Sequence, residues 1–182
     1  HPLISNKVIK YAGYHELAYL HPNRFTPDIS VLQELGVKEN EKYVIIRFVS
    51  WNASHDIGHK GISFENKLRA IQEFKKYAKI FISSEGKLPP EFEKYRIKLR
   101  PERMHDAVAF ATFIFGESST MAEETAMLGV PSIYLFNNST FYTTHLEKDY
   151  KILFNYSESQ VDQKNAIERG IELLKTENLG NI

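Results

Sequence analysis

The chain has 182 residues, 42% hydrophobic and 25% charged, so it can bury the core of one domain but is too short for two full domains. Lys plus Arg and Asp plus Glu both total 23, so the summed charge gives no long-range attraction to nucleic acid. The absence of cysteine excludes disulfides, thiolate metal sites and cysteine nucleophiles, and it agrees with a cytoplasmic location. No apolar run approaches the roughly 20 residues of a membrane-spanning helix, so we expect no membrane span.

The N-terminal region differs from the rest of the chain. It begins with His1-Pro2, which is neither an initiator methionine nor a secretory leader, so we expect the chain to be part of a longer protein. A short helical stretch is expected at residues 29–35. We expect residues 1–40 to form a linker-like segment that packs on a single domain formed by residues 41–182. We expect the tyrosines of this segment to pack against the domain rather than to recognise a ligand; they are Tyr11, Tyr14 and Tyr19.

From residue 43 onward, short apolar runs alternate with longer amphipathic stretches, which is typical of a parallel sheet covered by helices. In chain order the pattern predicts a strand at 43–49, a helix at 64–77, strands at 79–83 and 95–99, a helix at 104–110, a strand at 112–115, a helix at 119–128, strands at 132–136 and 152–154, and a helix that starts after residue 158. The predicted fold class is α/β. It is a Rossmann-like, doubly wound, mainly parallel sheet of about six strands in three α/β/α layers.

The strongest local signal is the block of residues 113–134, which joins a buried strand, a polar turn, a helix and another buried strand. Ser118, Ser119 and Thr120 follow the first strand, at the edge where open α/β sheets bind ligands. Amides in the first turn of a helix are unpaired donors, and the helix dipole adds roughly half a positive charge, so a diphosphate is favoured there. One turn further on, Glu123 or Glu124 could accept hydrogen bonds from a ribose diol. The alternative is a helix cap followed by a solvated acidic face.

The order of this block resembles the UDP-binding segment of UDP-N-acetylglucosamine 2-epimerases and related GT-B glycosyltransferases. The matching residues are Glu117-Ser118-Ser119-Thr120-Met121-Ala122-Glu123-Glu124, followed by Leu128-Gly129-Val130-Pro131. The resemblance implies that Ser118, Ser119 and Thr120 hold the diphosphate and that Glu124 holds the ribose hydroxyls. The epimerases have two glycines where this chain has Ser119 and Thr120, which predicts a less close approach of the backbone to the phosphates.

Nearly the whole chain also resembles a GT-B-like prokaryotic family known as domain of unknown function 354. The resemblance rests on residues 11–22 (YAGYHELAYLHP), residues 47–56 (RFVSWNASHD) and Met104-His105-Asp106, joined to the Glu117 block. It implies the C-terminal-type lobe of a GT-B fold, whose N-terminal lobe lies outside this chain. The reaction of that family is not established, so the resemblance bears more on fold than on function.

Other candidate residues lie in the loops after the first two strands and at the start of the predicted helix 104–110. The resemblance to the epimerases implies a histidine near the substrate in the loop 50–63, so His55 is the candidate acid/base group, with Asp56 as its orienter. A solvated loop is the alternative. With His59 these residues offer only three metal ligands in a flexible loop, so no metal is expected. Glu85 and His105 resemble positions that line the base and sugar cleft of GT-B proteins. For His105 the alternative is a residue at the start of a helix that is hydrogen-bonded to solvent.

Arg47 stands within an apolar strand, where an unpaired charge is costly to bury. It should therefore meet a carboxylate or a ligand phosphate, and a structural ion pair is the favoured choice.

These features favour a nucleotide-sugar enzyme, either a glycosyltransferase or an epimerase, of which this chain supplies the half that binds UDP or a UDP-sugar. No other cofactor is expected, and the isolated chain should be inactive without the N-terminal lobe. The expected partners are the nucleotide sugar and that lobe, with a homodimer as a further option. The alternative is a non-catalytic nucleotide-binding or assembly module. A receiver-like or dehydrogenase domain is disfavoured because no G-x-G-x-x-G follows the first strand.

Overall fold

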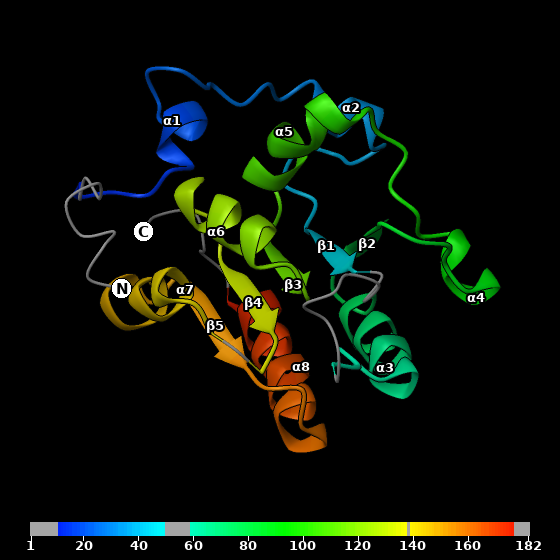
Figure 1. The fold of residues 1–182 in the computed structure, drawn as a ribbon. Coiled ribbons are helices and arrows are strands. Elements are labelled where there is room, and N and C mark those ends of the chain that lie inside the picture. Colours follow the sequence, from blue (N-terminus) through cyan, green and yellow to red (C-terminus); the bar gives the residue numbers. More distant parts are fainter. Residues whose placement is uncertain (1–10, 50–58, 138, 177–182) are drawn as a thin grey trace, which may run out of the picture.

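The computed structural model describes residues 11–49, 59–137 and 139–176, and its centre is a five-stranded sheet (Figure 1). All neighbouring strands pair in parallel, in the spatial order β2-β1-β3-β4-β5. The strands are β1 (Tyr43–Phe48), β2 (Lys79–Ser84), β3 (Phe113–Gly116), β4 (Ser132–Leu135) and β5 (Leu153–Tyr156). The α/β, Rossmann-like fold class predicted from the alternating pattern is therefore confirmed.

Helices cover both faces of the sheet, giving three layers. The helices are α1 (Leu17–Leu20), α2 (Val31–Glu34), α3 (Phe64–Phe74), α4 (Pro90–Glu93), α5 (Met104–Ala109), α6 (Ser119–Met127), α7 (Phe141–His145) and α8 (Gln160–Lys175). In Figure 1, α3 and α8 lie on one side of the sheet, and α5 and α6 lie on the other. A 3-10 turn (Pro101–Arg103) precedes α5, and a π-helical turn (Leu146–Tyr150) follows α7.

The central strands are buried on both faces, as the apolar runs predict for a parallel sheet. Side chains of β1 alternate between two clusters: Ile46 packs with α3 and α8, whereas Ile45 packs with α2 and α5. At the end of β3, Gly116 is required, because a Cβ there would lie 2.3 Å from the backbone oxygen of Arg47 on β1. This close approach brings the ends of β1 and β3 together.

The expected strand at residues 95–99 is not a strand of the sheet, so the sheet has five strands rather than about six. Residues 95–97 contact β2 at one point only: the Ile82 amide donates to Tyr95, and the Ile97 amide donates to Ile82. Beyond this bridge the chain continues to Pro101, which begins the 3-10 turn. The pairing therefore stops after one bridge.

The N-terminal segment packs over the helices of one face. Val31 of α2 is fully buried in the cluster that contains α5, and α1 contacts α6. Arg103 ties the two parts together, because its guanidinium bonds Asp28 at 3.1 Å, Glu34 at 2.9 Å and Asp106 at 2.6 Å. Residues 11–40 thus pack against α5 and α6.

Candidate functional site

A cleft of about 580 Å³ opens at the carboxyl end of the sheet. Its walls come from the ends of β1 and β2, from residues 96–104, and from the first turns of α6. The polar and charged residues that line it are Arg47, Ser83, Ser84, Glu85, Arg96, Ser118, Thr120 and Glu124. The edge at which parallel strands end is where open α/β folds bind ligands, so this cleft is the candidate site.

The start of α6 presents two amides at this edge that bond no described residue. Ser118 is extended (φ −101°, ψ 115°) and its side chain caps the helix, accepting from the Met121 amide at 3.3 Å. The capping role left open by the sequence is therefore present. Among the described residues, none accepts a hydrogen bond from the amides of Ser119 or Thr120. These donors at the positive end of the helix dipole are left for an anion.

The three residues of this turn differ in where they lie. Ser118 and Thr120 line the cleft, whereas Ser119 does not. Ser119 instead lies beside Tyr134, whose pKa is raised to about 12 by burial, an effect that the Ser119 hydroxyl opposes. The helix closes at Gly129 in the left-handed conformation, φ 76°, as its position after Leu128 predicts.

Glu124 is held by two side chains that are distant in the sequence. Its Oε1 accepts the Tyr19 hydroxyl at 2.9 Å and lies 3.1 Å from His105 Nε2. Hydrogen bonding to Glu124 raises the pKa of His105, against the opposing effect of burial. Burial alone would raise the pKa of Glu124, but the bonds from His105 and Tyr19 lower it. The carboxylate is therefore ionised and oriented at the wall of the cleft.

Two of the predicted site residues, His105 and Glu124, are thus brought together, although His105 is not itself in the cleft wall. Tyr19, which the sequence favoured as a packing residue, contacts the site directly. The only sequence signal for it was the aromatic cluster of the N-terminal segment.

Glu123 points away from the cleft. It is 5% exposed, and its carboxylate accepts the Thr140 hydroxyl at 3.2 Å. Burial and the neighbouring Glu16 carboxylate raise the pKa of Glu123. Of the two adjacent glutamates, only Glu124 faces the space where a ligand would lie.

Arg47 makes the ion pair expected from its place in an apolar strand. Its guanidinium bonds Glu85 Oε1 at 2.6 Å and the Ser83 hydroxyl at 2.8 Å. Its Nε is buried without a hydrogen-bond partner among the described residues. Glu85 is therefore in the cleft wall, but as the partner of Arg47.

Glu117, the residue before the α6 cap, is the most deeply buried charge of this edge. Its side chain has no exposed surface and accepts from the amides of Val49 at 3.0 Å and Ile62 at 2.6 Å, with Lys67 Nζ at 3.3 Å. Burial raises the pKa of Glu117, while Lys67 and the two amides oppose the rise. The carboxylate joins the residue after β1 to the residue before the α3 cap, a role that the sequence did not reveal.

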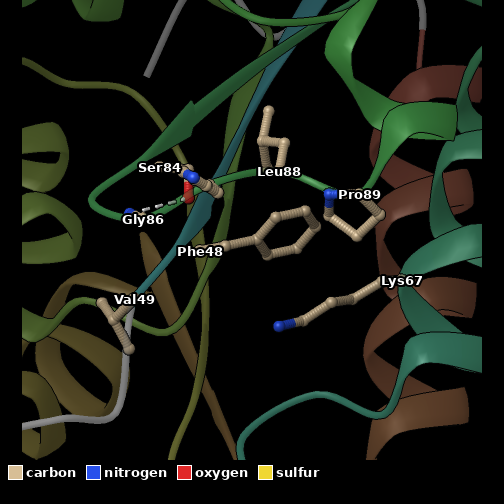
Figure 2. A pocket seen from close by; sticks show the side chains of 8 residues that line it. Phe48, Val49, Lys67, Ser84, Gly86, Leu88 and Pro89 are labelled. Carbon is tan, nitrogen blue, oxygen red and sulfur yellow. Dashed lines mark hydrogen bonds between the residues drawn. The ribbon is translucent and has the colours of Figure 1, made fainter.

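A second cavity of about 300 Å³ lies on the other side of the β2 end, and Figure 2 shows Lys67 reaching from α3 toward Phe48. The Lys67 ammonium lies 4.4 Å from the centre of the Phe48 ring. On the opposite wall, Ser84 Oγ accepts from the Gly86 amide at 3.3 Å. Ser84 lines both cavities, so the two are separated by the β2 terminus.

The candidate acid/base residues His55 and Asp56 lie outside the described residues. His59 is described, and its Nδ1 lies 2.9 Å from Glu158 Oε1 while its ring packs 4.3 Å from that of Phe136. In the described part of the chain, no group of three or more His, Asp or Glu side chains could hold a metal ion. No helix there is long and apolar enough to cross a membrane.

No family model matches the chain, and no curated protein matches it either. Among solved structures, a protein assigned as a UDP-N-acetylglucosamine 2-epimerase from Listeria monocytogenes is similar over 93% of this chain, with a TM-score of 0.56 and 14% identity. The UDP-GlcNAc 2-epimerase from Methanocaldococcus jannaschii is similar over 81%, with a TM-score of 0.54 and 16% identity.

The similarity covers 42% and 44% of those two proteins, so this chain spans less than half of their length. At such low identity the comparison bears on the fold and not on the chemistry. The chain therefore has the GT-B-like, Rossmann-type fold found within UDP-GlcNAc 2-epimerases.

Proposed function

We propose that this chain binds a nucleotide sugar, namely a UDP-sugar, as the C-terminal-type half of a GT-B enzyme. The diphosphate would lie at the start of α6, and the ribose would lie against Glu124. The single observation that carries the proposal is the pair of amides at Ser119 and Thr120, which bond no described residue, beside a cleft that Ser118, Thr120 and Glu124 line.

The charges of the cleft support a diphosphate. Free amides at a helix N-terminus favour an anion, and the Ser118 and Thr120 hydroxyls add further donors. Arg47 supplies a guanidinium in the same wall and has a buried Nε that lacks a protein partner among the described residues. Its pairing with Glu85 neutralises part of its charge, so the amides carry more of the attraction.

The placement of the two glutamates favours Glu124 for the ribose. It lines the cleft and its pKa is lowered, so it is a hydrogen-bond acceptor at neutral pH. Glu123 is buried against Thr140, and we do not assign it to the ligand. His105 would act on the ribose through Glu124, and Glu85 would act on the phosphates through Arg47.

Catalysis would need a second lobe, since GT-B active sites lie between two Rossmann-like halves. The matched region makes up less than half of each epimerase chain, 42% and 44%, which is in keeping with this expectation. His55 and Asp56 remain the candidate acid/base pair. Membership of the domain of unknown function 354 family, a homodimer and a cytoplasmic location also remain predictions.

Titration of the chain with UDP, followed by amide NMR, tests the binding claim. We expect chemical-shift changes at Ser118, Ser119, Thr120 and Glu124, with UMP causing smaller changes because it lacks the second phosphate. An absence of shifts in these residues at millimolar UDP would defeat the proposal.

A second candidate is a non-catalytic nucleotide-binding or assembly module. The observation that favours it is the presence of Ser119 and Thr120 where the epimerases have two glycines, since side chains there limit the approach of phosphates to the backbone. A full-length protein that binds UDP-sugars, but neither hydrolyses, epimerises nor transfers them, would select this alternative.

A further inference from the structure

Tyr19 and His105 bond the same oxygen of Glu124. Oε1 accepts the Tyr19 hydroxyl at 2.9 Å and lies 3.1 Å from His105 Nε2. A carboxylate oxygen has two lone-pair sites, so Oε1 is occupied. Within the described ranges no residue donates to Oε2, and Glu124 lines the cleft. Oε2 is therefore the acceptor that remains for a ligand.

The two donors are themselves held in place by the N-terminal segment. The His105 ring packs 5.8 Å from the ring of Tyr19 and, edge to face, 6.1 Å from the ring of Phe25. Tyr19 and Phe25 lie within residues 11–40, while His105 is in α5 and Glu124 in α6. Three separate parts of the chain thus converge on one carboxylate. Such an arrangement limits the rotamers that the Glu124 side chain can adopt.

We propose, resting on the nucleotide-binding function above, that Tyr19 and His105 are positioning residues that make the cleft selective for ribonucleotides. By saturating Oε1, they direct Oε2 of Glu124 at one hydroxyl of the ribose diol. A deoxyribose would leave Oε2 facing the ligand without a donor. The Glu124 side chain is only 18% exposed, so water replaces the lost hydroxyl poorly.

Loss of the Tyr19 hydroxyl should weaken this selectivity. Oε1 would then have a free lone pair, and the carboxylate could rotate or take up water, so the missing ligand hydroxyl would cost less. Tyr19→Phe changes one atom only and keeps the ring that packs on His105. Tyr11→Phe is a matched control, because Tyr11 is 65% exposed and no hydrogen bond of its hydroxyl is seen among the described residues.

The test compares UDP, 2′-deoxy-UDP and 3′-deoxy-UDP by calorimetric titration of the wild-type chain, Tyr19→Phe, His105→Gln and Tyr11→Phe. We expect the wild type to bind UDP about tenfold more tightly than one of the two deoxy analogues, as for one charge-assisted hydrogen bond. In Tyr19→Phe and His105→Gln this ratio should fall to about threefold. In Tyr11→Phe it should remain as in the wild type.

A ratio that stays the same in Tyr19→Phe and His105→Gln overturns the inference while leaving the proposed function intact. A uniform loss of affinity for all three ligands also overturns it, because a merely structural role would weaken binding without changing selectivity. Wild-type chain that binds none of the three nucleotides defeats the proposed function, and the inference with it. Thermal melts of each variant identify any that has failed to fold.

Discussion

Replacement of Ser119 by proline should remove one proposed diphosphate donor without disturbing the fold. Ser119 is the first residue of α6, and its amide has no acceptor among the described residues. Proline is favoured at the first position of a helix, where its missing N–H would be unpaired in any case. The chain itself begins α4 at Pro90. The preceding residue, Ser118, already has the extended conformation that a following proline requires.

The expected loss follows from the one bond removed. A backbone amide bonded to a charged phosphate contributes about 1.5–3 kcal/mol, so Ser119→Pro should weaken UDP binding about 10- to 100-fold. The free energy of unfolding should differ from that of Ser119→Ala by less than about 0.5 kcal/mol, because both variants lose the side-chain hydrogen bond to Tyr134 and the amide bonds no described residue. Ser119→Ala is the control, since it removes the hydroxyl but keeps the amide. Its affinity should fall by no more than a few-fold.

Isothermal titration with UDP measures the two affinities, and urea unfolding measures the stability of each variant. If Ser119→Pro is folded and binds UDP as tightly as Ser119→Ala does, the amide at the start of α6 is not a ligand donor. The reasoning that places a diphosphate there would then be refuted.

Three further predictions concern stability and titration. Gly170→Ala should lower the free energy of unfolding, measured in urea, by about 1–2 kcal/mol, because the added Cβ would lie 2.6 Å from the fully buried ring of Phe74. The gain in helix propensity, roughly 1 kcal/mol, does not offset this clash. An unchanged urea midpoint would contradict the prediction. Lys67→Met should cost about 2 kcal/mol at pH 7 by leaving the buried carboxylate of Glu117 without its cation. The pKa of Glu117 is already raised and would rise further without Lys67, so the stability lost in Lys67→Met should shrink as pH falls and the carboxyl is protonated. The control is Lys76→Met, which breaks the exposed Lys76–Glu73 pair. Its loss of stability should stay within about 0.5 kcal/mol at pH 7 and at lower pH. In Glu124→Gln the pKa of His105, followed by the NMR shifts of its ring protons, should fall toward 6.5, and an unchanged value would show that Glu124 is not its partner. Because the pKa of His105 is raised, the His105–Glu124 pair stabilises the folded state below pH 6.5 and loses this effect as pH rises through the raised value. Because the pKa of Glu124 is lowered, the stabilisation is also lost as pH falls below 4.5 through the lowered value.

Most of the architecture could be predicted from local patterns. The apolar runs of β1, β3 and β4 marked buried parallel strands, and Ser118 and Gly129 marked the two ends of α6. Where the prediction was wrong, the missing information was non-local. Residues 95–99 have the composition of a strand, but only one bridge to β2 forms before the chain turns to Pro101.

The site was predictable in outline only. The position of Ser118 after a buried strand was enough to place the turn at the carboxyl edge of the sheet, because all parallel strands end there. Helix periodicity alone did not separate Glu123 from Glu124, since α6 has little amphipathic pattern, although the resemblance to the epimerases singled out Glu124. Adjacent helical residues point about 100° apart, so Glu123 bonds Thr140 whereas Glu124 lines the cleft.

The sequence by itself therefore determined the alternation of strands and helices, the caps of α6 and the edge of the sheet at which the candidate cleft lies, because these depend on residues close together in the chain. Only the tertiary structure decided which carboxylate faces the cleft, that Tyr19 reaches Glu124 across 105 positions, and that Glu117 bonds the amides of Val49 and Ile62. Such contacts depend on how separate elements pack, and no local pattern of residue types encodes them.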